Sequence, residues 1–194
     1  SEEIDEIQPS DKIPTAEQAY VTDTVSLSIE KGIYDKYLIH GVTGSGKTEV
    51  YLNLAEKVVN KGKDVIVLVP EIALTPMMVR RFTQRFGNNI EVMHSRLSMK
   101  ERYNAWMKIK RGEVKIALGT RSCIFAPFNN LGLIAIDEEH DSSYISDRTP
   151  RYHTDFVADK RAQMEKAVLV LGSATPKITT YKAFEKSGKV LTMT

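Results

Sequence analysis

A glycine-rich octapeptide, GVTGSGKT at residues 41–48, carries the residue types that bind a polyphosphate. It fits the pattern G-x-x-x-x-G-K-[ST] and lies between an apolar stretch at 36–40 and a helical one at 47–61. In that setting the backbone amides of the loop point inward, and the following helix adds the positive end of its dipole. The octapeptide therefore predicts a nucleotide-phosphate site. The alternative is a glycine-rich turn that fits the pattern by chance.

Residues of this loop are expected to bind both the phosphates and a metal ion. Lys47 is expected to reach the β- and γ-phosphates, and Thr48 is expected to ligate Mg²⁺ through its hydroxyl. The cofactors predicted are therefore ATP and Mg²⁺. The cofactor-binding residues predicted within the loop are Gly41, Thr43, Gly44, Ser45, Gly46, Lys47 and Thr48.

A second group of reactive side chains lies in the run LIAIDEEH at residues 133–140. Asp137 ends an apolar strand there and is expected to hold Mg²⁺, directly or indirectly, while Glu138 is suited to polarise water as a general base. The alternative is a charged run that caps a strand and enters a surface loop. Together with the phosphate loop, the run predicts hydrolysis rather than binding alone, with Lys47, Asp137 and Glu138 as the catalytic residues.

Short apolar stretches that alternate with longer helical ones position both motifs. The predicted strands are 36–40, 64–69, 90–93, 114–119, 131–136 and 167–172, and the predicted helices are roughly 47–61, 75–86, 98–111, 153–166 and 177–187. This alternation is typical of an α/β fold with a mostly parallel central sheet. Ligands bind beyond the carboxyl ends of the strands in such sheets, which is where the motifs lie.

Length and composition favour one intracellular globular domain. The chain has 194 residues, of which 42% are hydrophobic and 27% charged, so a sizeable core is expected and wholesale disorder is not. The net charge of +2 is too balanced to indicate nucleic acid by itself. A single cysteine, Cys123, excludes an internal disulfide and a cysteine-rich zinc site, so no zinc is predicted within this chain.

The same composition predicts no membrane partner and a cytoplasmic location, because no apolar run approaches the roughly 20 residues that span a bilayer. Residues 1–12 are acidic and lack apolar periodicity, so we expect a tail or linker there. Residues 13–194 are expected to form the ATP-binding lobe.

The order of the motifs resembles that of superfamily 2 DExH helicases. DEEH (137–140) resembles the DExH box, LGSATP (171–176) motif III, LVPEIALT (68–75) motif Ia, and LGTRSCIFAPF (118–128) motif Ib. Over about residues 13–182 the chain is similar to the family of primosomal replication-restart helicases. The resemblance implies a P-loop NTPase with a RecA-like three-layer sandwich, and specifically the first of two RecA-like lobes.

On the nucleotide side, the resemblance implies a role for Gln18 in IPTAEQ, whose amide would read the adenine by donating and accepting at once. The alternative is an ordinary surface glutamine. His140, Ser173 and Thr175 resemble groups that couple the nucleotide site to DNA movement, with His140 also close to the nucleotide. Ser and Thr at a strand end are also ordinary helix caps, and the two roles are compatible.

On the DNA side, Thr75, Thr120, Arg121 and Ser122 resemble residues that hold the phosphates of a single strand, which positions the strand without reading its sequence. A structural ion pair is the alternative for Arg121.

The stretch YISDRTPRYH, residues 144–153, resembles an aromatic-rich loop with which related helicases sense DNA. Tyr144 and Tyr152 would stack on bases, and Arg148 and Arg151 would contact DNA beside them. Ile145 stands where the family usually has lysine, which weakens an electrostatic contact at that position. A surface loop with incidental aromatics is the alternative.

Other conspicuous side chains are expected to be architectural. Trp106 and Met107 are predicted to pack in the core from an amphipathic helix. Arg80, Arg81 and Arg85 are predicted to form a solvated helix face, with a basic stripe near DNA as the alternative. The role of His94, at a strand end, stays open.

The function implied is that of the nucleotide-binding lobe of an ATP-dependent 3′-to-5′ DNA helicase acting in replication restart and primosome assembly at stalled forks. The implied partners are single-stranded or forked DNA, a second helicase lobe of the same parent chain, primosome proteins and single-stranded DNA-binding protein. About 18 residues follow LGSATP, too few for a second lobe with its arginine finger, so the isolated lobe is expected to lack unwinding.

Three alternatives stay open: a RecG-like or restriction-type translocase, a nucleotide-switched binding module, and a small-molecule phosphotransferase. The resemblance to motif III and to the DExH box argues against the phosphotransferase.

Overall fold

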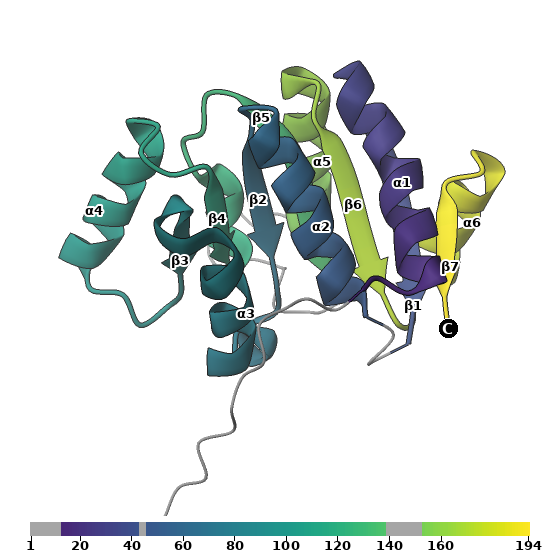
Figure 1. Cartoon of the computed structure of the whole chain (residues 1–194), viewed down its shortest axis with the longest axis horizontal. Coiled ribbons are helices and arrows are strands. Elements are labelled where there is room, and N and C mark those ends of the chain that lie inside the picture. The colour runs from purple at the N-terminus through teal and green to yellow at the C-terminus, as the bar shows by residue number, and fades with distance from the viewer. Residues whose placement is uncertain (1–12, 43–45, 139–152) are drawn as a thin grey trace, which may run out of the picture.

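A seven-stranded sheet forms the centre of the computed structural model, which describes residues 13–42, 46–138 and 153–194 (Figure 1). The strands are β1 (Asp35–Gly41), β2 (Asp64–Leu68), β3 (Ile90–Met93), β4 (Ile116–Gly119), β5 (Leu131–Asp137), β6 (Val168–Ser173) and β7 (Val190–Met193). Their order in the sheet is β3-β4-β2-β5-β6-β1-β7, and every neighbouring pair is parallel. All carboxyl ends of the strands therefore lie at one edge.

Helices cover both faces of this sheet, which confirms the predicted three-layer α/β sandwich. One face packs against α1 (Ala16–Lys31), α2 (Lys47–Asn60) and α3 (Pro76–Phe86), and the other against α4 (Met99–Lys110), α5 (Thr154–Glu165) and α6 (Ile178–Lys186). Short 3₁₀ helices follow β2, α3 and β4: these are η1 (Glu71–Ala73), η2 (Gly87–Asn89) and η3 (Arg121–Phe125).

Alternation along the strands divides the core between the two faces. In β2, whose five residues are all buried, Val65 and Val67 pack toward α2, whereas Ile66 and Leu68 pack toward the opposite layer. Successive side chains of a strand point to opposite faces, so an all-apolar strand requires helices on both sides. The strand composition thus explains the layered architecture.

Two elements were absent from the sequence prediction. Helix α1 has Thr15 as its N-cap, where a capping box joins Thr15 and Gln18, and Gly32 as its C-cap, whose φ of 63° suits glycine. Its buried positions include Thr22, Ser26 and Ser28, so its apolar periodicity is weak. Strand β7 is a four-residue edge strand, and its pairing with β1 is a long-range contact that local composition does not reveal.

The described part of the chain contains no helix that is both long and apolar enough to cross a membrane.

Replacing Phe82 with Ala should destabilise the fold strongly. Phe82 is fully buried between α3 and the sheet, so its loss leaves a cavity and should lower the free energy of unfolding by about 3–5 kcal/mol. Urea unfolding measures the change. Phe156, which is 65% exposed on α5, is the matched control, and Phe156→Ala should change stability by less than about 1 kcal/mol. Equal effects of the two changes would contradict the assigned packing.

Candidate functional site

The phosphate-loop motif lies between the carboxyl end of β1 and the first turn of α2. Gly46 has φ 89°, a left-handed conformation that favours glycine, and Lys47 is the first residue of α2. A β-carbon added to Gly46 would lie 2.1 Å from Nε2 of Gln18, so the two residues are in close contact. Nε2 of Gln18 donates to the carbonyl oxygen of Gly46 at 3.3 Å. This contact fixes the start of α1 against the loop.

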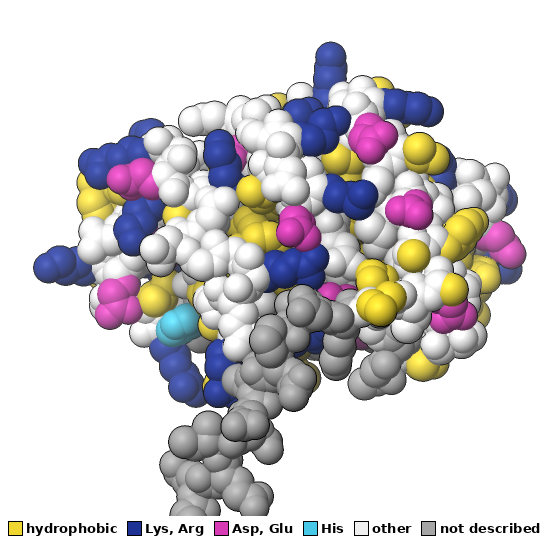
Figure 2. All heavy atoms as spheres, in the orientation of Figure 1, with side chains coloured by type: hydrophobic (Ala, Val, Ile, Leu, Met, Phe, Trp, Pro, Cys, Tyr) yellow, Lys and Arg dark blue, Asp and Glu magenta, His cyan; other side chains and the backbone are white. Residues whose placement is uncertain are grey.

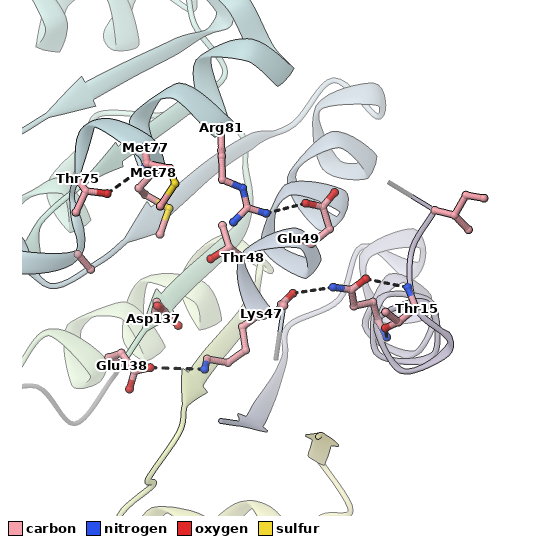
Figure 3. Close-up of a pocket in the computed structure, with 14 residues that line it drawn as sticks. Thr15, Lys47, Thr48, Glu49, Thr75, Met77, Met78, Arg81, Asp137 and Glu138 are labelled. Atoms are coloured by element: carbon pink, nitrogen blue, oxygen red, sulfur yellow. Dashed lines mark hydrogen bonds and ion pairs between the residues drawn. The ribbon is translucent and has the colours of Figure 1, made fainter. Parts of the chain in front are cut away.

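An ion pair joins Lys47 and Glu138. The Lys47 side chain is largely buried, and its Nζ donates to the carbonyl oxygen of Gly41 at 2.7 Å. The same nitrogen lies 3.6 Å from Oε1 of Glu138 (Figure 3). One cation thus links the carboxyl end of β1 to the residue that follows β5. A phosphate bound beside Lys47 would compete with Glu138 for this cation.

Asp137 is a buried carboxylate held by an aromatic hydroxyl. Tyr51 of α2 donates its hydroxyl to Oδ1 of Asp137 at 2.7 Å. In the sheet Asp137 pairs with Gly172 of β6, and a β-carbon on Gly172 would lie 1.7 Å from the Tyr51 hydroxyl. Because Gly172 has no side chain, the Tyr51 hydroxyl can reach Asp137.

Burial raises the pKa of the Asp137 carboxyl above its ordinary value, because the charged form loses solvation. The hydrogen bond from Tyr51 and the charge of Lys47 oppose this change, whereas the negative charge of Glu138 adds to it. The pKa of Asp137 is therefore sensitive to its immediate neighbours.

Glu138 adopts a conformation that side-chain-bearing residues rarely take. Its φ is 50°, in the left-handed region, directly after the extended residues of β5. Backbone strain of this kind is found at functional sites, where the surrounding structure enforces it. Here the turn brings the Glu138 carboxylate to Lys47 rather than continuing the strand.

A cavity of about 750 Å³ joins these groups. Its lining residues are Ile13, Thr15, Gln18, Gly46, Lys47, Thr48, Glu49, Ala73, Thr75, Met77, Met78, Arg81, Asp137 and Glu138. Cavities of about 300–1,000 Å³ are typical of small-molecule sites. The volume therefore suits a nucleotide.

The donor set in the cavity fits Mg²⁺. Thr48 offers a hydroxyl and Asp137 a carboxylate in the same cavity. Among the described residues no group of three or more His, Cys, Asp or Glu could hold a metal by itself. Mg²⁺ is commonly bound by one or two protein oxygens together with substrate phosphates and water, so a sparse oxygen set suits it.

Gln18, Ser173 and Thr175 make local hydrogen bonds. The Gln18 side-chain oxygen accepts from the backbone amide of Thr15, and Gln18 also lines the cavity. Ser173 is buried at the end of β6, and its hydroxyl accepts from the amide of Thr175 at 3.1 Å. This contact is a local turn and not a helix cap, because the next helix, α6, has Lys177 as its N-cap and no side-chain cap hydrogen bond. The coupling role of Ser173 and Thr175 stays a prediction. Reading of adenine by Gln18 also stays a prediction.

The described residues that are expected to contact DNA, Thr75 and 120–122, follow carboxyl ends of strands at the same edge of the sheet. Thr75 is the N-cap of α3, where its hydroxyl accepts from Met78, and it also lines the cavity. Thr120 directly follows β4, and Arg121 and Ser122 begin η3.

Several predicted residues lie outside the described residues. They are Thr43, Gly44, Ser45, His140, Tyr144, Arg148, Arg151 and Tyr152.

The α3 arginines differ from the solvated face expected of them. Arg81 and Arg85 both pair with Glu49 of α2, at 2.9 Å and 3.2 Å, while Arg80 is exposed. Arg85 is paired on a second nitrogen with Glu56, at 2.5 Å. Neither a free basic stripe nor a solvated face describes this pair. Sequence reasoning also missed Tyr51 and Gly172, whose importance depends on the register of β5 and β6.

One smaller expectation has a clear outcome, and His94, whose role the sequence leaves open, makes a local hydrogen bond. Trp106 packs against the core from α4, as expected. His94 accepts a hydrogen bond from the amide of Arg96 through Nδ1.

Comparison with known families and proteins agrees with the predicted resemblance. The family model for DEAD/DEAH box helicases matches residues 16–184. Replication restart protein PriA of Bacillus subtilis (strain 168) is 53% identical over 172 residues, covering 89% of this chain and 21% of that protein. PriA of Synechocystis sp. (strain ATCC 27184 / PCC 6803 / Kazusa) is 52% identical over 149 residues, covering 76% of this chain and 18% of that protein. The chain thus spans about a fifth of the length of these relatives.

Solved structures with low sequence identity share the fold. RecG bound to a three-way DNA junction has a TM-score of 0.69 at 20% identity, covering 94% of this chain and 24% of that one. The Pyrococcus furiosus Hef helicase domain has a TM-score of 0.59 at 23% identity, covering 89% of this chain and 37% of that one. Together with the sheet order, these similarities confirm the predicted RecA-like α/β fold.

Replacing Tyr51 with Phe should raise the pKa of Asp137 further. The hydroxyl of Tyr51 stabilises the ionised carboxylate, and its removal leaves burial less opposed. Carboxyl-carbon NMR titration follows the change. Tyr20→Phe, at a tyrosine that is 63% exposed, is the control and should leave the titration unchanged. An unchanged or lowered pKa in Tyr51→Phe would contradict the assigned hydrogen bond.

Proposed function

Because the chain belongs to the DEAD/DEAH box helicase family, we propose that it is the ATP-binding lobe of a DNA helicase that acts in replication restart. The observation that carries the proposal is the meeting of Lys47, Thr48, Asp137 and Glu138 in one cavity at the carboxyl ends of β1 and β5. These are the groups that bind phosphates, hold a divalent cation and activate water in phosphoryl transfer.

Each group has one task in the proposed hydrolysis. Lys47 binds the terminal phosphates, and Thr48 with Asp137 holds Mg²⁺, which neutralises charge on the phosphates when bound. Glu138 accepts a proton from the attacking water. Since Lys47 is paired with Glu138, phosphate binding also releases the Glu138 carboxylate to act as the base.

Protonation of Asp137 should oppose metal binding. Mg²⁺ requires the ionised carboxylate, and burial raises the pKa of this group. Affinity for Mg²⁺-nucleotide is therefore expected to fall as pH drops through the raised pKa, and to recover above it.

Replication restart and DNA as substrate are proposed from the relatives, whose name is replication restart protein. On this basis the longer parent protein translocates 3′ to 5′ on single-stranded or forked DNA and acts with primosome proteins and single-stranded DNA-binding protein. Thr75, Thr120, Arg121 and Ser122 support the DNA assignment, because hydroxyls and a cation at one sheet edge suit phosphate contacts. A second RecA-like lobe of the parent would supply the arginine finger.

Lys47→Ala and Glu138→Gln in the full-length parent should separate binding from hydrolysis. Lys47→Ala should abolish ATP hydrolysis and unwinding and weaken ATP binding, while DNA binding persists. Glu138→Gln should keep ATP binding but slow hydrolysis by about 100- to 10,000-fold, because the proton acceptor is lost. Lys186→Ala and Glu185→Gln, at exposed positions of α6, are the matched controls and should be unaffected. Unwinding that survives Lys47→Ala would refute the assignment.

The 194-residue chain alone should bind ATP weakly and hydrolyse it at a barely detectable rate, with no stimulation by single-stranded DNA. The reason is that transition-state charge is stabilised across two lobes. Phosphate-release assays with and without DNA check this expectation. Vigorous DNA-stimulated hydrolysis by this chain would contradict the two-lobe mechanism.

A further inference from the structure

The cavity has a second wall that the nucleotide assignment leaves unexplained. Thr15 and Gln18 line one side at the start of α1, and Met77, Met78 and Arg81 line another from α3. The start of α2 lies between these two walls, as Figure 3 shows. A ligand whose phosphates sit on α2 therefore has α3 beside it.

Arg81 is held in place but not fully engaged. Its Nη2 donates to Oε2 of Glu49 at 2.9 Å, and its side chain is 42% exposed. Within the described residues, Glu49 is the polar partner of the Arg81 side chain. The remaining donors and the flat faces of its guanidinium are thus open to a ligand, and the carboxylate fixes their position at the cavity wall.

Arg85 provides the contrast on the same helix. Its Nη1 donates to the other oxygen of Glu49, and its Nη2 donates to Asn53 and Glu56. Its side chain is 18% exposed. Arg85 therefore suffices to tie α3 to α2, and this structural role does not require Arg81 to line the cavity.

We propose that Arg81 is a further nucleotide-binding residue, which packs against the base of the bound nucleotide rather than binding its phosphates. The inference rests on the proposed ATP site. Glu49 already neutralises Arg81 and would repel a phosphate beside it, whereas Lys47 takes the phosphates at the other end of the cavity. A planar guanidinium that lines the same cavity as the thioether side chains of Met77 and Met78 suits a flat aromatic ring.

Two ligands distinguish a base contact from a phosphate contact. Isothermal titration of this chain with Mg²⁺-ADP and with Mg²⁺-pyrophosphate compares affinities with and without the nucleoside. Arg81→Ala should weaken ADP binding by about 2- to 30-fold, as expected for loss of a cation–π contact, and should leave pyrophosphate binding unchanged. Arg80→Ala, at the exposed neighbour that does not line the cavity, should change neither affinity. Thermal unfolding of each variant verifies the fold.

Each other outcome overturns the proposal. Equal weakening of ADP and pyrophosphate would assign Arg81 to the phosphates or to the packing of α3. Unchanged ADP binding would leave Arg81 outside the site. Lys47→Ala tests the ATP site itself and should weaken the binding of both ligands. If Lys47→Ala has no effect, or the unaltered chain binds neither ligand, the proposed ATP site fails and the role of Arg81 fails with it.

Discussion

The hydrogen bond from Tyr51 to Asp137 depends on three separate segments, and the rest of the site is arranged around it. Helix α2 supplies the hydroxyl, β5 supplies the carboxylate, and β6 supplies the glycine over which they meet. Since α2 also begins with Lys47, the same helix positions the cation and the group that holds the acid. A shift of β6 by one residue would place Ser173 or Leu171 beneath Tyr51 and block the contact. The parallel register is therefore a functional constraint as well as a structural one.

Electrostatic balance in the site is set by burial. Asp137, Glu138 and Lys47 form a partly desolvated group in which one cation faces two carboxyls. Charges in such surroundings interact more strongly than in water, and each carries a solvation cost unless it is paired. A bound divalent cation adds positive charge and a bound polyphosphate adds negative charge. These three side chains therefore suit the two ligands bound together better than either ligand alone.

Much of the fold could be predicted, because buried parallel strands are continuous apolar runs and the phosphate loop has its own pattern. β1, β2, β3 and β5 lie close to the predicted ranges. Helix α1 was missed because hydroxyl and amide side chains occupy several of its buried positions. Strand β7 was missed because a four-residue edge strand exists only by pairing. Within the site, the sequence predicted Lys47 and Glu138 as catalytic residues, but the ion pair between them depends on the fold and was not predicted. The part played by Arg81 depends on the side chain of Glu49, which no local pattern reveals.

The close contact between Gln18 and Gly46 gives the first turn of α1 a mechanical role. The amide of Gln18 caps its own helix through Thr15 and bonds to the loop through Gly46, with no room for a β-carbon between them. The loop end and the start of α1 therefore behave as one rigid piece. A displacement of Gly46 on phosphate binding would therefore act first on the start of α1, which packs on the same face of the sheet as α2.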